Sequence, residues 1–193
     1  MKLNKLVLLI TLLIIIFSSV GSVSAVNYKG YESNGILFQY PEDWQMAHSV
    51  GEGSVAAVSY KNDSSISIVI QQVPSELGKE LQEAYEANNK NLAKEGGSSY
   101  SSLQETKTTV NGKTAIVHRY ITNTNGVEKE HVATWLKMED GKLYVILYSA
   151  PIEFYEQETP SYNNVVNTFE LEAYHSSSNI FSKIIDEFVE LFH

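Results

Sequence analysis

The chain contains no cysteine among its 193 residues. This absence excludes structural disulfides, thiol catalysis and a lipid-modified cysteine at a cleavage point. A folded form must therefore be held together by its hydrophobic core. The length corresponds to about one domain, which is enough to bury such a core without further cross-links.

Basic residues are also scarce, since 14 Lys and Arg stand against 23 Asp and Glu, giving a formal net charge of −9. Nucleic acids and anionic membranes are bound by basic surfaces. The charge balance therefore argues against nucleic-acid binding, and the excess of acids is typical of a soluble surface.

Motifs for catalysis or cofactor binding are missing as well. The sequence has no Gly-x-Ser-x-Gly elbow, no glycines at phosphate-loop spacing and no Asp-x-Asp-x-Asp-Gly calcium loop. We therefore expect no cofactor and no enzymatic activity, and no motif alone states what the chain does.

The first 25 residues have the three parts of an export signal. Lys2 and Lys5 provide the positive end, residues 6–17 form an apolar run, and small residues end at Ala25. The pattern predicts cleavage between Ala25 and Val26 and an extracellular or cell-envelope location. The run is short for a membrane span, so membrane attachment is expected only if this segment is retained uncleaved as an anchor.

Three short turn sequences, Asn111-Gly112, Asn125-Gly126 and Asp140-Gly141, separate four runs rich in Thr, Val, Ile, Tyr and Trp between residues 103 and 150. Asn-Gly and Asp-Gly readily adopt the positive φ angles of a type I′ hairpin turn. The pattern predicts a four-stranded antiparallel meander.

Two-residue turns also predict which side chains share a face, because residues opposite one another in a hairpin point to the same side. Counting from Asn125-Gly126 sets His118 opposite Ala133, and counting from Asp140-Gly141 sets Tyr148 opposite Ala133. One face should then hold Glu105, His118, Tyr120, His131, Trp135, Tyr144 and Tyr148. The other should be aliphatic, with Ala115, Val117, Val132, Leu136, Val145 and Leu147.

Further strands are expected at residues 36–40, 55–60 and 66–73. One helix is expected from Pro74-Ser75 to about Glu95, and another with Thr159 as its cap and Pro160 at its first position. Residues 26–175 should thus form an α+β domain. Its antiparallel sheet of about seven strands would be flanked by helices as an α/β/α sandwich.

The last 18 positions differ in character, because serines 176–178 read as a linker before a C-terminal amphipathic helix. Its apolar side carries Phe181, Ile184, Ile185, Phe188, Val189 and Phe192. An isolated helix this short is marginal in water, so it should pack on its own domain, on a protein partner or on a membrane. The acidic residues on its polar side argue against anionic lipid.

Two candidate sites follow from the predicted face. Glu105, His118 and His131 carry donor groups that suit a divalent metal, although His118 could simply pair with Glu105 while His131 stacks on Tyr120. The aromatic side chains Tyr120, Trp135, Tyr144 and Tyr148 form a candidate ligand face.

Residues 36–41 followed by Trp44, the turn 111–113, the strand 141–146 and the closing segment 165–169 resemble the PsbP-like family in order and spacing. That family is named after an extrinsic protein of the photosystem II oxygen-evolving complex. The resemblance spans residues 35–171 and implies an α/β/α sandwich with a non-enzymatic binding or accessory role. It supplies no catalytic residue. A related domain binds the Ran GTPase, and the terminal helix departs from the photosynthetic members, so their role is not carried over.

The leading hypothesis is an exported accessory domain that holds an unknown protein partner through the aromatic face or the terminal helix. The alternative is a small-ligand or divalent-metal binding protein that uses the surface around Glu105, His118, His131 and Tyr148. A closed pocket there, in place of a helix covering the same side, would favour this alternative. A hydrolase of unrecognised type is the least favoured of the three.

Overall fold

The computed structural model describes residues 26–48, 53–61 and 63–173. The expected signal with its cleavage point after Ala25 lies outside the described residues, as do the linker and the C-terminal helix with Phe181, Ile184, Ile185, Phe188 and Phe192. Within the described part, no helix combines the length and the apolar character that a membrane span requires.

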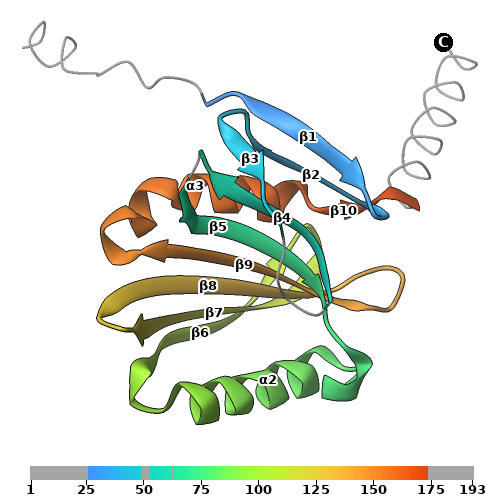
Figure 1. Cartoon of the computed structure of the whole chain (residues 1–193). Coiled ribbons are helices and arrows are strands. Elements are labelled where there is room, and N and C mark those ends of the chain that lie inside the picture. Colours follow the sequence, from blue (N-terminus) through green and yellow to red (C-terminus); the bar gives the residue numbers. More distant parts are fainter. Residues whose placement is uncertain (1–25, 49–52, 62, 174–193) are drawn as a thin grey trace, which may run out of the picture.

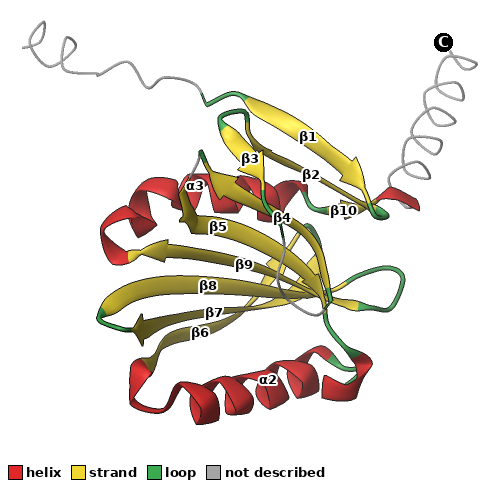
Figure 2. Cartoon of the chain, viewed as in Figure 1, coloured by secondary structure: helices red, strands yellow, loops and turns green. Residues whose placement is uncertain are grey.

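A seven-stranded antiparallel sheet forms the centre of the fold (Figures 1 and 2). Its strands follow the order β3-β4-β5-β9-β8-β7-β6. They are β3 (Trp44–Met46), β4 (Ser54–Tyr60), β5 (Asp63–Gln72), β6 (Tyr100–Val110), β7 (Lys113–Thr124), β8 (Val127–Lys137) and β9 (Leu143–Pro151). A smaller antiparallel sheet holds β1 (Tyr28–Ser33), β2 (Ile36–Pro41) and β10 (Glu170–Leu171), in the order β1-β2-β10.

Two helices, α2 (Leu81–Gly96) and α3 (Ile152–Thr168), cover opposite faces of the large sheet (Figure 1). The short 3-10 turns η1 (Ser75–Leu77) and η2 (Gly97–Ser99) flank α2. Helix α3 also contacts β2, so the small sheet lies beside it. The α/β/α arrangement around a seven-stranded antiparallel sheet is confirmed.

Both helices begin elsewhere than the sequence suggests. The first is interrupted after η1 by Gly78, whose φ of 133° is incompatible with a helix, and α2 starts only at Leu81. Helix α3 starts directly after Pro151 and includes Pro160, which was expected at its first position. Thr159 is therefore not a cap, and its hydroxyl donates a hydrogen bond to the Tyr155 carbonyl at 2.7 Å inside the helix.

The two Asn-Gly turns of the meander behave as expected. Asn125 and Gly126 have φ angles of 55° and 83°, and Asn111 and Gly112 have φ angles of 49° and 76°. The resulting register sets His118 opposite Ala133, Tyr120 opposite His131 and Glu105 opposite His118. These pairings are confirmed.

The connection at Asp140-Gly141 is different, and the register expected there is wrong by one residue. Strand β8 ends with Lys137 opposite Leu143, so residues 138–142 form a loop of five residues. Within it, the Met138 N–H donates to the Lys142 carbonyl at 2.9 Å and the Gly141 N–H donates to the Met138 carbonyl at 3.0 Å. Asp140 has no positive φ, and a type I′ turn requires one.

This shift turns every side chain of β9 to the other face. Trp135 lies opposite Val145, and Thr134 lies opposite Ile146. Tyr144 and Tyr148 therefore point to the α3 side, away from His118 and Trp135, while Val145 and Leu147 take their places on the α2 side.

Each face of the sheet has its own apolar core. On the α3 side, residues of β2, β4, β5, β9 and α3 pack together around Ile146, which is 0% exposed. On the α2 side, Leu81, Ala84 and Tyr85 of the helix pack on Ile116, Ala133, Trp135 and Val145 of the sheet. Strands β7, β8 and β9 each contribute residues to both cores.

We predict that Ile146→Ala lowers the free energy of unfolding by about 3 to 4 kcal/mol, because it leaves a cavity in the middle of the α3-side core. Val127→Ala is the control, since Val127 is 54% exposed at a strand end, and its cost should stay within about 0.5 kcal/mol. Chemical denaturation measures both. Equal costs for the two variants would contradict this packing.

Candidate functional site

Six rings gather on the α2 side of the sheet, and we call them the aromatic cluster. They belong to Tyr85 on α2 and to Tyr100, His118, Tyr120, His131 and Trp135 on or beside β6, β7 and β8. The Tyr85 ring meets those of His118 and Trp135 edge-on, at centroid distances of 5.6 and 5.9 Å. Tyr120 and His131 stack at 4.7 Å, which confirms that contact.

Helix α2 covers much of this cluster. His118 is 2% exposed and Trp135 is 4% exposed. The expectation that the aromatic side offers an open surface for a protein partner is therefore wrong, because Tyr85 and its helix already occupy that side.

Hydroxyl groups surround both histidines of the cluster. His118 Nε2 forms a hydrogen bond with Ser102 Oγ at 3.0 Å. His131 forms one with Ser149 Oγ through Nδ1 at 2.7 Å and another with Thr122 Oγ1 through Nε2 at 2.8 Å. Burial lowers the pKa of His118, and burial together with the nearby charge of Lys129 lowers the pKa of His131 to about 4. Both rings are therefore neutral at pH 7.

The three metal candidates share a face, as the register predicts, but their polar atoms are directed elsewhere. The Glu105 carboxylate accepts a hydrogen bond from the Tyr85 hydroxyl at 2.9 Å. His118 and His131 bond to the hydroxyl groups named above. Across the described ranges, the structure shows no group of three or more His, Asp and Glu side chains that could hold a metal ion.

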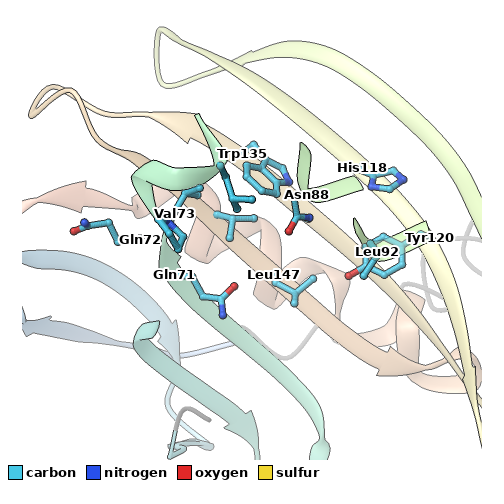
Figure 3. A pocket seen from close by; sticks show the side chains of 13 residues that line it. Gln71, Gln72, Val73, Asn88, Leu92, His118, Tyr120, Trp135 and Leu147 are labelled. Carbon is cyan, nitrogen blue, oxygen red and sulfur yellow. The ribbon is translucent and has the colours of Figure 1, made fainter. Parts of the chain in front are cut away.

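A cavity of about 220 Å³ lies between α2, η1 and the sheet, next to the aromatic cluster (Figure 3). Trp135, Val145 and Leu147 form apolar lining from the sheet, and Asn88 and Gln71 bring amide groups. The remaining lining residues are Gln72, Val73, Pro74, Leu77, Leu92, His118, Tyr120 and Ala133. Every buried side-chain nitrogen or oxygen among the described residues has a hydrogen-bond partner.

The contribution of α2 to this cavity was not predicted from the sequence, because asparagines on a helix are typical of an exposed polar side. Asn88 lines the cavity, and Asn89 accepts a hydrogen bond from the Tyr100 hydroxyl at 2.6 Å. The available signal was spacing: Tyr85, Asn88 and Leu92 stand at positions i, i+3 and i+7, which lie on one side of a helix.

Tyr144 and Tyr148 are not part of a ligand face. Tyr148 stacks on Tyr155 and Tyr162 at 5.3 and 5.7 Å, and its hydroxyl donates to the Tyr155 carbonyl at 3.0 Å. The Tyr144 hydroxyl donates to Asp140 at 3.2 Å. Both rings belong to the α3-side core because the longer β8–β9 loop shifted their strand.

A second hollow, of about 310 Å³, runs along α3 where the helix leaves part of β7 uncovered, and we call it the α3 groove. Its lining residues are Val110, Val117, Arg119, Val132, Thr134, Tyr155, Glu156, Thr159, Tyr162, Asn163, Val166 and Asn167. Near one end, the Asn111 side-chain amide donates to the Asn167 carbonyl at 2.8 Å.

Charged side chains line the α3 groove away from Asn111. Arg119 Nε donates to the Glu130 carboxylate at 3.0 Å, and the guanidinium lies 5.2 Å from the centre of the Tyr155 ring. Glu156, with its side chain 82% exposed, lies 3.7 Å from Arg119. The groove therefore combines an aliphatic floor with a charged rim.

A sequence model of the PsbP family matches residues 26–171. The chain belongs to the PsbP family. A search among curated proteins finds no match. Solved structures share the fold, and they include cyanobacterial PsbP from Synechocystis, with a TM-score of 0.56 and 17% identity over 79% of this chain and 97% of that one.

Two further structures resemble this PsbP-family chain. The Saccharomyces cerevisiae Ran-binding protein Mog1p has a TM-score of 0.54 and 13% identity over 77% of this chain and 97% of its own. LpqN of Mycobacterium tuberculosis, involved in cell envelope biogenesis, has a TM-score of 0.51 and 14% identity over 77% of this chain and 92% of its own. At these identities the likeness shows the fold alone.

The histidines of the aromatic cluster predict a pH dependence. The pKa of His131 falls from 6.5 to about 4 on folding, so the unfolded chain binds a proton more readily than the folded chain between these values. Its stabilising contribution is complete above pH 6.5 and is lost as the pH falls to about 4. This loss amounts to at most about 3 kcal/mol.

Replacing His131 with Gln should flatten this part of the stability curve, because glutamine does not titrate and can still bond to Thr122 or Ser149. His48→Gln, a change at an exposed histidine, is the matched control and should leave the slope unchanged. Urea unfolding at pH values from 4 to 7 measures the slopes. If His131→Gln kept the slope of the unaltered chain, the burial of that ring would be refuted.

Proposed function

We propose that this PsbP-family chain is an exported, non-catalytic binding domain that holds a protein partner at the cell envelope. The observation that carries the proposal is the α3 groove, which combines an aliphatic floor with a charged rim on the face that α3 leaves partly open. A protein segment can bury apolar side chains in such a groove while its polar groups stay at the rim.

The charges of the chain favour one kind of partner segment. Glu156 is the most exposed charged group described at the rim, and the chain as a whole carries a formal net charge of −9. Arg119 is already engaged by Glu130. A segment that presents branched aliphatic side chains to Val117 and Val132 and a basic residue to Glu156 would match both features.

The sequence and the similar structures both support the proposal of an exported binding domain. The first 25 residues read as an export signal. Mog1p is described as a Ran-binding protein and LpqN as involved in cell envelope biogenesis, so the fold occurs in a protein-binding role and in an envelope role. Export and partner are part of the proposal.

A photo-crosslinking side chain at Asn163, which is exposed and lines the α3 groove, tests it in cells that export the full chain. We expect a discrete crosslinked protein at this position. Glu156→Lys should reduce its yield at least about tenfold, because the reversed charge repels a basic partner residue. Mass spectrometry should find a basic residue beside apolar ones in the crosslinked segment.

Glu153→Lys is the matched control, since it makes the same charge change on the exposed side of the same helix outside the α3 groove. It should leave the crosslink yield nearly unchanged. Equal losses for both variants would point to net charge alone and overturn the assignment to the groove, and so would the absence of any discrete adduct at Asn163.

The cavity beside the aromatic cluster favours a second candidate, a small-ligand binding domain. Its volume of about 220 Å³ is below the range of about 300–1,000 Å³ typical of ligand pockets, so it suits a small planar molecule. Such a molecule would pack on Trp135 and bond to the amide groups of Asn88 or Gln71.

The indole N–H resonance of Trp135 reports on this cavity directly. If the candidate is right, a subset of small planar compounds should shift that resonance, and Leu147→Phe should abolish the shift by filling the space. Val127→Phe, the same kind of enlargement at an exposed strand end outside the cavity lining, is the control. A shift that persisted in Leu147→Phe, or no shift with any compound, would remove this candidate.

A further inference from the structure

Strand β6 is one of the two edges of the large sheet, and no other described strand pairs with its outer side. The other edge, β3, has 3 residues, whereas β6 has 11. All side chains from Ser101 to Thr109 are exposed. A long edge strand presents a row of unpaired N–H and C=O groups that can pair with another strand.

The turn after β6 fixes which backbone N–H and C=O groups of this strand point away from β7. Val110 and Lys113 flank the two-residue turn and form its hydrogen-bonded closing pair. In an antiparallel ladder, hydrogen-bonded and non-hydrogen-bonded pairs alternate. Counting back from Val110, the residues that direct N–H and C=O away from β7 are Thr109, Lys107 and Glu105.

We propose that this chain forms a two-fold symmetric dimer in which β6 pairs antiparallel with β6 of a second copy, centred on Thr106. Such a pairing joins the two large sheets into one continuous sheet. Because a two-fold contact uses the same surface twice, the dimer closes and leaves no free β6 edge.

Charge complementarity selects this register. With Thr106 on the two-fold axis, Glu105 lies opposite Lys107 of the second copy, and Lys107 lies opposite Glu105 of the second copy. Both residues direct their free backbone groups outward, so each of these pairs is hydrogen-bonded. Oppositely charged side chains directly across a pair stabilise a sheet.

The neighbouring registers are unfavourable. A centre at Glu105 would place two glutamates opposite each other, and a centre at Lys107 would do the same with two lysines, which destabilises the pair. If the two-fold axis passed between two residues, the outward-directed N–H and C=O groups of one copy would face residues of the other copy whose backbone groups already bond to β7. The register centred on Thr106 also sets Leu103, which is 48% exposed beside a bulge, near Thr109 of the second copy.

The absence of cysteine from the chain allows a direct test of the register. In the full chain, Thr106→Cys should form an intermolecular disulfide under mild oxidation, because the two Cα atoms across the axis lie about 4.5–5.5 Å apart, within disulfide range. Thr108→Cys is the control. Residue 108 lies opposite Gln104 of the second copy, so the two cysteines at position 108 stay too far apart for a disulfide. They should crosslink at least about tenfold less.

Charge reversal tests the same contact without a covalent bond. Lys107→Glu and Glu105→Lys should each weaken dimerisation at least about tenfold, since each replaces two attractive pairs with two repulsive ones. An equimolar mixture of the two variants should dimerise again, because each copy then meets its opposite charge. Sedimentation at several concentrations measures association, and thermal melting checks that both variants fold.

A mixture that associates no better than either variant alone would overturn the proposal. So would equal crosslinking of Thr106→Cys and Thr108→Cys, or an unaltered chain that stays monomeric at every concentration. None of these variants lies in the α3 groove, so the outcome is independent of the partner proposed above.

Discussion

Side chains alternate between the two faces of a strand, and this constraint determines what each layer of the molecule contains. The loop between β8 and β9 has five residues, and that length places Ile146 and Tyr148 beneath α3 and Val145 and Leu147 beneath α2. A loop that shifted the pairing of β8 with β9 by one residue would exchange these two pairs of side chains between the faces. The two apolar cores and the cavity depend on this one connection.

The two faces consequently differ in chemistry. On the α2 side, Tyr85 closes over His118 and Trp135, and the polar atoms of the aromatic cluster bond to nearby hydroxyl and carboxylate groups. On the α3 side, the helix leaves part of β7 uncovered beside a charged rim. The structure thus has a small cavity on the α2 side and an open groove on the α3 side.

Much of the meander can be read from sequence because Asn-Gly turns impose positive φ locally, and the pairings of His118 and Tyr120 follow by counting. Asp140-Gly141 is ambiguous, since the same dipeptide suits a longer loop in which only Gly141 has positive φ. The start of α3 was misplaced because Pro160 is typical of a first helical turn but is also tolerated within this helix. The helical spacing of Asn88 places it on the same side of α2 as Tyr85, but the strands that this side meets are set by tertiary contacts, which the spacing does not specify.

A proton contact map of the full chain around the Trp135 indole tests the pairing of β8 with β9. The register predicts contacts from that ring to the methyl groups of Val145 and to the Tyr85 ring, because all three lie on the α2 side. Contacts from the Trp135 ring to the Ile146 methyl groups and the Tyr148 ring would contradict it. They would return Tyr148 to the histidine-bearing face and exchange the β9 residues of the two apolar cores.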